Sequence, residues 1–338
     1  MKVTIKDVAK AANVSVATVS RVINNLGGYS EETKRQVLKV IEELGYEPNA
    51  VARGLVSRRT KTIALIVPDL TSTLAMELLK GVEQGAHKQG ISVILCNTES
   101  QGIKTMDYLK LLNEKRIDGI IYASNELELE YYEYIKKMNV PLVLLATQSN
   151  RFPVPFVKVN DRSAAYSAVS FLIKKGHRKI GMISAGEEDP IAGVPRIEGY
   201  MMAMKDHGLP VNENWLVRTK GFFFEDGKEG FFRLINQEPD ITAVFAGSDD
   251  MAVGVLSAAN RLGIKVPADL SLIGYDNLKI AEMVVPTLTT VAQPLVEMGE
   301  KAADMVIEML ETGEIVESLY LPHKIIERQS VIDISTAK

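Results

Sequence analysis

The stretch TIKDVAKAANVSVATVSRVIN, residues 4–24, predicts two short helices joined by a tight turn. The first helix is expected to begin near Ile5, because Thr4 is a good N-cap and Asp7, three positions later, completes a capping box. Small side chains on this helix let a second helix approach closely. The inner face of this first helix is predicted to carry Val8 and Ala11, with Ala9 and Ala12 beside them.

The second helix is expected after a turn at residues 13–14, with Ser15 as its N-cap. Its buried face is predicted from apolar residues that recur at helical spacing, namely Val19, Val22 and Ile23. Its outward face then carries Val16, Ala17, Thr18, Ser20, Arg21 and Asn24.

That outward face suits the major groove of DNA, into which the second helix of such a pair inserts. Val16 and Ala17 can make only apolar contacts, such as those to a thymine methyl, and Arg21 alone offers a strong base-reading fork. The remaining polar side chains suit phosphate oxygens, which position a module without specifying sequence. With the first N-cap included, this polar set is Thr4, Ser15, Thr18, Ser20 and Asn24.

A generic amphipathic helix pair has the same pattern, and two further features favour the DNA-binding hypothesis. A third helix is predicted between a cap at Ser30 and a stop at Gly45. Residues 1–62 hold 11 Lys and Arg against 6 Asp and Glu, a net charge of +5, whereas the whole chain has −4. The positively charged N-terminal region is therefore expected to face the negatively charged DNA, and residues 1–47 are interpreted as an all-α helix-turn-helix headpiece.

The composition of the chain excludes several classes of protein. The 338 residues include 46% apolar and 24% charged residues, which is typical of a globular protein, and no apolar run is long enough to span a membrane. Cys96 is the only cysteine, so a reducing cytoplasm is expected. The sequence has no nucleotide-binding glycine motif and no nucleophile elbow. We therefore expect no enzyme, no catalytic residue, no cofactor and no metal site; the histidines are scattered at His87, His177, His207 and His323.

From residue 61 onward, apolar runs alternate with amphipathic stretches, which predicts an α/β core of two doubly wound subdomains. Helices are expected near 73–89, 105–116, 127–138, 195–207 and 249–262. The buried parallel strands are predicted at 63–67, 93–96, 119–123, 141–145, 180–184, 243–247 and 272–276.

Residues 48–60 connect the headpiece to the core and are predicted to form a short hinge helix after a cap at Asn49. Such a helix is marginal alone and would order only when something packs on it. Its arginines make DNA a natural partner, and a flexible basic linker is the alternative.

Seven ordered motifs make the whole chain resemble the LacI/GalR family of bacterial transcription regulators. They are TIKDVAKAANVSVATVSRVIN, LGYEPNAVARGL, KGHRKIG, PRIEGY, SDDMAVG, VPADLSLIGYDN and LTTVAQPLVEMG. The resemblance implies that the hinge helices of two subunits meet in the minor groove, where Leu55 wedges into a base step and bends the DNA. The implied hinge contacts are Asn49, Ala52, Arg53 and Leu55.

The resemblance also implies that the core has the periplasmic-binding-protein fold, whose two subdomains close on a small molecule. The chain is expected to cross between the subdomains near residues 160, 290 and 321. The core, 61–338, then divides into an N-subdomain of 61–160 plus 292–321 and a C-subdomain of 162–290 plus 322–338.

The effector site implied by the family lies between these subdomains. Arg196 matches the arginine that holds ligand hydroxyls or a carboxylate, and Asp276 matches the acid that accepts sugar hydroxyls. Phe223 falls where an aromatic ring stacks on a sugar, although core packing of the run 222–224 is an equal alternative. The full predicted set is Asp69, Ser72, Asn160, Asp161, Arg196, Phe223, Ser248, Asp249 and Asp276.

Departures from the family pattern narrow the choice of effector. Many relatives have Asn-Pro-Phe-Phe where this chain has Ser-Thr-Leu-Ala at 72–75, which makes a purine less expected. The segment LPHKIIERQS and the Val16-Ala17 pair resemble Gram-positive catabolite control proteins, which serine-phosphorylated HPr activates. Asp304, however, stands where those proteins place an arginine that grips the phosphoserine, and this argues against phosphorylated HPr as a partner.

The sequence therefore predicts a DNA-binding homodimer, a repressor released from a pseudo-palindromic operator by a small carbohydrate. The alternative is a regulator of the catabolite-control type, activated by a co-repressor or a phosphocarrier. A sugar-transport protein fits less well, because the headpiece has no place in one. No leucine heptads follow Ser330, so a coiled-coil tetramer is not expected.

Overall fold

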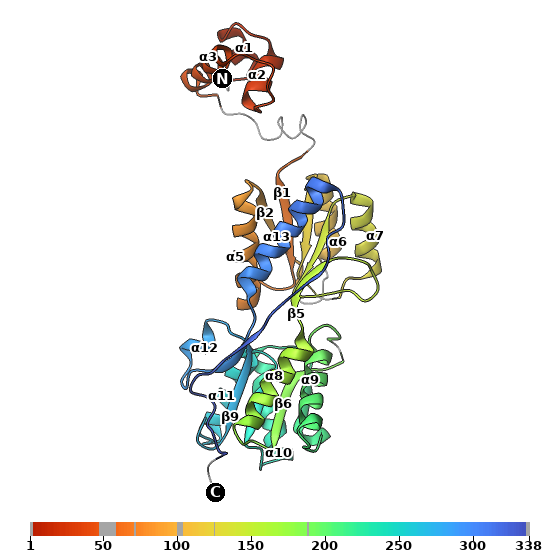
Figure 1. The fold of residues 1–338 in the computed structure, drawn as a ribbon, viewed down its shortest axis with the longest axis vertical. Helices are drawn as coiled ribbons and strands as arrows, with labels where there is room; N and C mark the ends of the chain where they lie inside the picture. The colour runs from red at the N-terminus through yellow and green to blue at the C-terminus, as the bar shows by residue number, and fades with distance from the viewer. Residues whose placement is uncertain are drawn as a thin grey trace. The chain divides into compact units, whose positions relative to one another are not determined.

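The computed structural model describes residues 3–46, 59–70, 72–99, 104–124, 126–187 and 189–335. Contacts within the chain divide it into two compact units. The first comprises Met1–Thr62 with Lys115–Asp118 and is mainly an all-helical headpiece; the second holds the rest of the chain as an α/β core (Figure 1).

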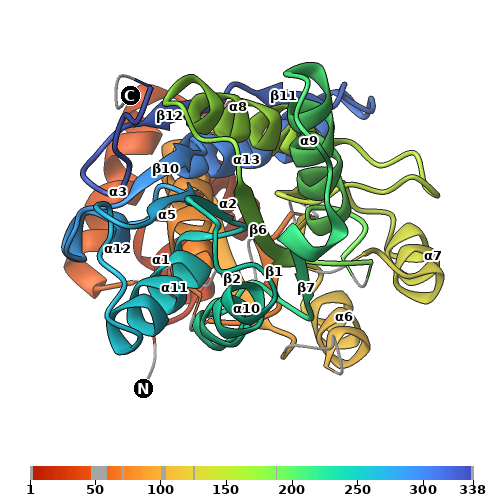
Figure 2. The same ribbon diagram turned by 90° about the horizontal axis from the view of Figure 1, so that it is seen from below.

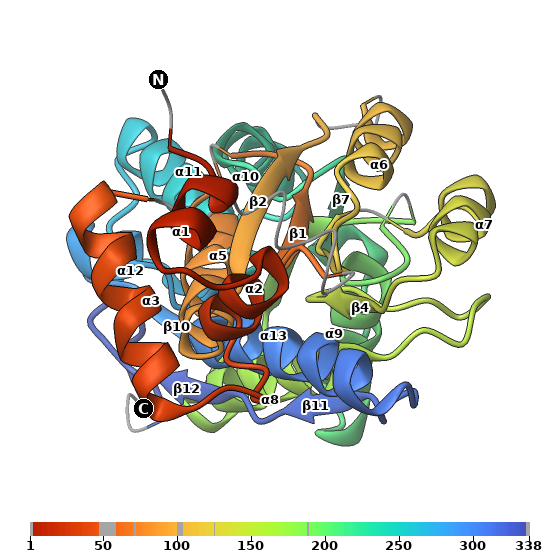
Figure 3. The same ribbon diagram turned by 90° about the horizontal axis from the view of Figure 1, so that it is seen from above.

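The headpiece consists of α1 (Ile5–Ala11), α2 (Val16–Ile23) and α3 (Glu31–Leu44), which cross one another in Figure 3. The predicted caps are confirmed. The Thr4 backbone N–H and hydroxyl both donate to Asp7 Oδ2, at 2.9 and 2.7 Å, and Ser15 Oγ accepts from the Thr18 N–H at 3.0 Å. Gly45 ends α3 in the left-handed conformation, with φ of 59°.

The hydrophobic core of the headpiece is small, and among the described residues its buried side chains are valines and alanines. The prediction for Ala11 is wrong, because this residue is exposed whereas Ala9 and Ala12 are buried. The face that α1 turns to its neighbours is centred on Ala12, four residues after Val8, rather than on Ala11. The buried set is Val8, Ala9, Ala12, Val19, Val22, Val37 and Val40.

The first sheet of the core has six strands in the order β11-β5-β4-β3-β1-β2. The β1–β3, β3–β4, β4–β5 and β5–β11 pairs are parallel. Its strands are β1 (Thr62–Val67), β2 (Ser92–Asn97), β3 (Gly119–Tyr122), β4 (Leu142–Leu145), β5 (Phe156–Val159) and β11 (Leu319–Leu321). Its helices are α5 (Thr73–Lys88), α6 (Thr105–Glu114), α7 (Leu129–Met138) and α13 (Leu295–Thr312).

The second sheet has the order β12-β10-β9-β8-β6-β7, and only the β10–β12 pair is antiparallel. Helices α8 and α9 lie on one side of it and α10 and α11 on the other (Figure 2). The strands are β6 (Ile180–Ala185), β7 (Leu216–Thr219), β8 (Ala243–Ala246), β9 (Ser271–Asp276), β10 (Thr289–Ala292) and β12 (Lys324–Ile326). The helices are α8 (Asp161–Lys174), α9 (Gly193–Asp206), η1 (Glu213–Trp215), α10 (Phe224–Gln237), α11 (Asp249–Arg261) and α12 (Ile280–Met283).

Close helix packing covers the first sheet, where α5 lies against α13 (Figure 1). A Cβ atom at Gly81 would come within 2.0 Å of the Val296 carbonyl oxygen, and one at Gly299 within 2.3 Å of the Leu78 carbonyl oxygen. Only glycine permits this contact at either position. The first half of the core thus depends on a helix from near the C-terminus.

All seven predicted strands are present, as are the five predicted helices, with ends that differ from the predicted ones by at most two residues. The doubly wound fold class is confirmed, and the antiparallel edge strand β12 is an addition to it. The chain passes from the first sheet to the second after β5, returns after β10, and crosses again between β11 and β12. Among the helices of the described residues, none has the length and apolar character needed to cross a membrane.

Candidate functional site: an exposed helix and a buried charge cluster

The outward face of α2 is accessible over most of its predicted contact residues. Val16 is 41% exposed, Ala17 and Arg21 are exposed, and Thr18, Ser20 and Asn24 are partly buried. An apolar side chain such as Val16 costs free energy when it is left in water, so its position on this face favours a surface that is covered by a partner.

The polar side chains of α2 are held by bonds within the helix. The Ser15 and Thr18 hydroxyls lie 2.9 Å apart, and Asn24 Nδ2 donates to the Ser20 carbonyl oxygen at 2.8 Å. Arg21 extends over the loop that follows, where a Cβ at Gly28 would lie 2.8 Å from its Nη1 atom. The absence of a side chain at Gly28 therefore leaves space for this guanidinium.

Four of the predicted DNA contacts fall outside the described residues. They are the hinge positions Asn49, Ala52, Arg53 and Leu55. Thr4 is described and exposed, and its hydroxyl is bonded to Asp7.

In the core, the predicted effector residues Arg196 and Asp161 form a buried ion pair. Arg196, in the first turn of α9, is 6% exposed, and its Nε and Nη2 atoms each lie 2.9 Å from Asp161 Oδ1. Its Nη1 donates to the Gly247 carbonyl oxygen at 2.5 Å. Burial alone would lower the pKa of Arg196, but the Asp161 carboxylate outweighs this effect and the pKa is raised. The guanidinium is therefore permanently charged, and its bonds to Asp161 and Gly247 fix its position.

Two aromatic rings lie beside this guanidinium. The Arg196 Cζ atom is 3.7 Å from the ring centre of Tyr275 and 4.9 Å from that of Phe222. Phe223, the predicted stacking residue, is 53% exposed and is the N-cap residue of α10. The structure therefore brings Phe222 rather than Phe223 onto the arginine, because the residue at the start of α10 turns its ring to solvent.

Asp161 connects the arginine to a buried lysine. Tyr275 Oη donates to Asp161 Oδ1 at 3.0 Å, and Lys158 Nζ lies 3.0 Å from Asp161 Oδ2. Lys158 is 3% exposed and also donates to the Ile191 carbonyl oxygen at 3.1 Å. Lys158 was not among the predicted residues, although a charged residue inside the apolar segment 154–159 was a usable signal.

Two further acidic residues, Asp249 and Asp276, lie at the carboxyl ends of β8 and β9. Asp249 accepts from the Leu278 N–H at 2.7 Å and from Thr290 Oγ1 at 2.6 Å, and Asp276 Oδ1 accepts from Gln293 Nε2 at 2.7 Å. Burial raises the pKa of Asp276 to about 7, and burial together with the Asp276 carboxyl raises the pKa of Asp249 well above its usual range. Near neutral pH each of these carboxyls is therefore ionised to a smaller extent than an ordinary aspartate, which limits the repulsion between them.

The Asp276 backbone has a φ of 114°, in the region that favours glycine. Strain of this kind costs of the order of 1–3 kcal/mol and concentrates at functional sites. It supports the assignment of Asp276 to the site.

Three of the remaining predicted residues cap helices. Ser248 Oγ accepts from the Met251 N–H at 3.0 Å and donates to the Phe222 carbonyl oxygen at 2.7 Å, so it fixes the aromatic segment. Asn160 caps α8 and is exposed, Ser72 caps α5, and Asp69 follows β1 and is half-buried. The hydrogen bonds of Arg196 are instead to Asp161 and to the Gly247 carbonyl oxygen.

Two buried hydroxyls at strand ends were not predicted. Thr147 follows β4 and is 4% exposed, and Ser184 lies in β6 and is fully buried. Neither oxygen has a hydrogen-bond partner among the described residues. Buried polar atoms are normally paired, so these two are candidates for ligand contacts. Their positions at the carboxyl ends of predicted strands were a signal for them.

Comparison with known proteins is consistent with this two-part arrangement. Residues 4–49 match the family model "Bacterial regulatory proteins, lacI family", and residues 169–331 match "Periplasmic binding protein-like domain". The chain is 38% identical to catabolite control protein A of Priestia megaterium, over 98% of this chain and 99% of that protein. It is 40% identical to the transcriptional regulator RegA of Clostridium acetobutylicum, again over 98% and 99%.

A solved structure described as the transcriptional regulator CelR–cellobiose complex matches with a TM-score of 0.75 and 29% identity. The match covers 97% of this chain and 99% of that one. Both the headpiece and the core are therefore shared with this neighbour.

Proposed function

Because the chain belongs to the LacI family of bacterial regulatory proteins, DNA-binding regulators with an effector-binding domain, we propose that it is a repressor released from its operator by a small carbohydrate. The observation that carries the proposal is the buried Arg196–Asp161 pair beside Asp276 at the carboxyl ends of the second sheet. Ligands of open α/β sheets bind at that edge.

The chemistry of this site favours a ligand rich in hydroxyl groups. Arg196 supplies N–H donors, and the Asp276 carboxyl supplies an acceptor oxygen beyond the one that Gln293 Nε2 binds. Phe222 adds an aromatic surface next to them. Sugars combine polar edges with apolar faces, and the CelR neighbour is described in complex with cellobiose.

The DNA-binding half of the proposal assigns the outward face of α2 to the major groove. A single strong base-reading side chain, Arg21, specifies little, so the spacing of two half-sites and the bending of DNA must supply further specificity. We therefore propose a homodimer. Met283 and Val285, 67% and 92% exposed, are apolar side chains of the core that a second copy could cover.

The catabolite-control alternative is favoured by the 38% identical relative of that name. Asp304, on α13, is exposed and lies 3.9 Å from Lys301 Nζ. A carboxylate at this position repels a phosphoserine, so a co-repressing phosphocarrier is the second candidate rather than the first.

The direction of the effector response separates these candidates. An operator duplex would be selected from a random pool by the full chain, and release would be followed by fluorescence anisotropy with cellobiose, ribose, glucose and maltose. Serine-phosphorylated HPr would be titrated separately. We expect one of the sugars to release the DNA. Tightening by phosphorylated HPr, or by a sugar, would replace the induction proposal with the co-repressor one.

The hinge assignment has its own test. Leu55→Ala is expected to reduce both operator affinity and DNA bending, because no side chain then unstacks the central base step. Bending would be measured by the mobility of circularly permuted duplexes, with Val56→Ala as the neighbouring control. Unchanged bending in Leu55→Ala would show that Leu55 is not a wedge.

A further inference from the structure

At each of the three crossings of the chain between the two halves of the core, a side-chain contact joins one half to the other. In each case a residue at or beside the crossing bonds to a residue of the second half, and only the first contact is ionic. The contacts join Lys158 Nζ to Asp161 Oδ2 (3.0 Å), Gln293 Nε2 to Asp276 Oδ1 (2.7 Å), and His323 Nε2 to Ser167 Oγ (2.8 Å).

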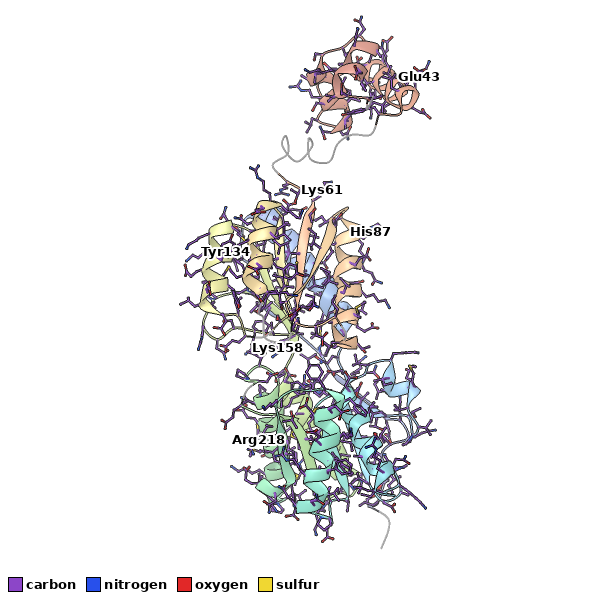
Figure 4. The ribbon with its side chains drawn as sticks, turned by 180° about the vertical axis from the view of Figure 1, so that it is seen from behind. Glu43, Lys61, His87, Tyr134, Lys158 and Arg218 are labelled. Atoms are coloured by element: carbon purple, nitrogen blue, oxygen red, sulfur yellow. The ribbon has the colours of Figure 1, made fainter. Side chains whose placement is uncertain are left out.

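Lys158 is unusual because it is a buried cation that belongs to one half and is compensated by the other. It lies on β5, paired in register with Tyr320 of β11 in the first sheet. Its partners are Asp161, the first residue of α8, and the Ile191 carbonyl oxygen in the loop before α9. Figure 4 shows Lys158 where the two halves meet. A buried ammonium needs such compensation, so movement of the halves that breaks these contacts is costly.

The same carboxylate serves the arginine of the proposed effector site. Asp161 Oδ2 faces Lys158, whereas Oδ1 accepts from Arg196 and from Tyr275. Arg196 has five N–H donors, of which Asp161 and Gly247 use three, so a ligand can bind the other two and then shares the positive charge of the guanidinium with Oδ1. Asp161 then depends more strongly on Lys158, and the arrangement of the halves that preserves the Lys158 contact becomes more favourable.

We infer that Lys158 is a positioning residue that transmits occupancy at Arg196 to the hinge between the two halves of the core. This inference rests on the proposed effector function. It supplies what coupling requires, an interaction whose free energy differs between the free and the occupied state. Lys158 acts through Asp161 and does not itself contact the ligand.

The first experiment separates binding from coupling. For Lys158→Met, cellobiose affinity would be measured by calorimetry, and operator affinity would be measured with and without saturating cellobiose. Both affinities in isolation are expected to stay within about threefold of the unmodified protein. The ratio of operator affinities, about 5- to 150-fold for typical allosteric proteins, is expected to fall close to one. Lys174→Met, an exposed lysine on α8, is the matched control.

Two outcomes of this experiment would overturn the inference. An unchanged ratio would show that Lys158 does not carry the coupling, and loss of cellobiose binding would place Lys158 in the binding site itself. Lys158→Gln, which keeps a donor toward Ile191 but removes the charge, is expected to behave like the methionine variant and tests the charge if Lys158→Met fails to fold.

A second experiment needs no ligand and distinguishes failure of the inference from failure of the proposed function. Hydrogen–deuterium exchange of the ligand-free protein is expected to rise in residues 156–163 and 189–192 for Lys158→Met and to stay unchanged for Lys174→Met. Unchanged exchange in Lys158→Met would show that Lys158 does not hold the two halves of the core together at this crossing. If none of the four sugars changes operator binding by the unmodified protein while the exchange result is as expected, the carbohydrate proposal is wrong. The role of Lys158 in joining the two halves is then still supported.

Discussion

The headpiece and the core place their functional residues in opposite environments. In the headpiece, the candidate DNA contacts lie on the outside of α2, and a small set of valines and alanines holds the helices together from the inside. In the core, Lys158, Asp161 and Arg196 are 3%, 5% and 6% exposed and bond to one another. A surface that meets a macromolecule can be separate from the structure that supports it, whereas a site that encloses a small molecule is part of that structure.

This difference has a consequence for how substitutions behave. A change on the outer face of α2 removes a contact to DNA and leaves the helical core intact. A change at Arg196 removes one of the two cations that Asp161 contacts inside the core, so it affects the effector response and the free energy of unfolding together.

The largest effect is expected from salt. If about 6–10 phosphates are contacted, operator affinity falls by about 10³- to 10⁵-fold between 50 and 200 mM salt, because counterions are released from DNA on binding. Affinity for an uncharged sugar in the buried site should change by less than about threefold, since ions do not screen a buried cluster effectively. Anisotropy and calorimetry over the same salt series would measure both. A flat operator response would contradict the DNA-binding assignment.

Two arginine substitutions test the contrast directly. Arg196→Met is expected to abolish the sugar response and to lower the free energy of unfolding by about 3 kcal/mol, because Asp161 loses one of its two cations. Arg21→Met is expected to change the free energy of unfolding by less than about 0.5 kcal/mol and to weaken operator binding by about 1–3 kcal/mol.

Urea unfolding and operator titration of both variants would provide the comparison. If Arg196→Met retained its sugar response, Arg196 would be a structural residue only. If Arg21→Met lost stability as well as affinity, the recognition face would not be separable from the fold.

The parts of the fold that could be predicted are those that local sequence determines. Caps such as Ser15 and Ser30 act within one helical turn, and buried strands such as 63–67 are continuous apolar runs. Strands β5 and β10 were not predicted, because the sequences FVKV and TTVA contain polar residues that find partners only across the fold. Helix α8 is buried on several sides, which removes the clear amphipathic period that reveals surface helices.

The residues of the candidate site show the same difference between what local sequence determines and what depends on the fold. Arg196 and Asp276 came from resemblance to the family and Asp161 from its place at the expected crossing between the subdomains; in the core Asp161 bonds to Arg196, and Asp276 bonds to Gln293. Lys158 could not be identified as part of the network, because its pairing with Asp161 depends on how the chain turns from β5 into α8. Whether Phe222 or Phe223 meets the arginine depends on where α10 begins, a boundary that periodicity fixes only to within a few residues.

Acidic residues of the two regions are expected to respond to pH in opposite directions. Burial raises the pKa of Asp276 to about 7, above the unfolded value near 3.8, so the folded state binds more protons between those values. Its contribution to stability is therefore present at low pH and is lost as the pH rises toward 7, by about 2 kcal/mol between pH 5 and 7 for one proton. In the headpiece, the Thr4 hydroxyl and N–H lower the pKa of the exposed Asp7, so its small contribution is instead lost as the pH falls through the folded pKa.

The variant Asp276→Asn removes the titrating group and is expected to flatten the pH dependence of core unfolding between pH 5 and 7. Urea unfolding at several pH values would measure it, with Asp240→Asn, an exposed residue of the same half, as the control. If Asp276→Asn kept the full slope, another group would be responsible, and Asp249 would be the next to test.

The smallest effect is expected from the cap of α2. Ser15→Ala removes the oxygen that accepts from the Thr18 N–H, and loss of such a cap costs about 1 kcal/mol. The headpiece has a small core, so this loss should lower the temperature of headpiece unfolding while the unfolding of the core stays unchanged. Calorimetry of the full chain would resolve the two, with Arg35→Ala, an exposed position in α3 without a cap, as the control. A shift in the core transition instead would mean that the headpiece and core unfold as one unit, and the separation between an exposed site and a buried one would not extend to their stabilities.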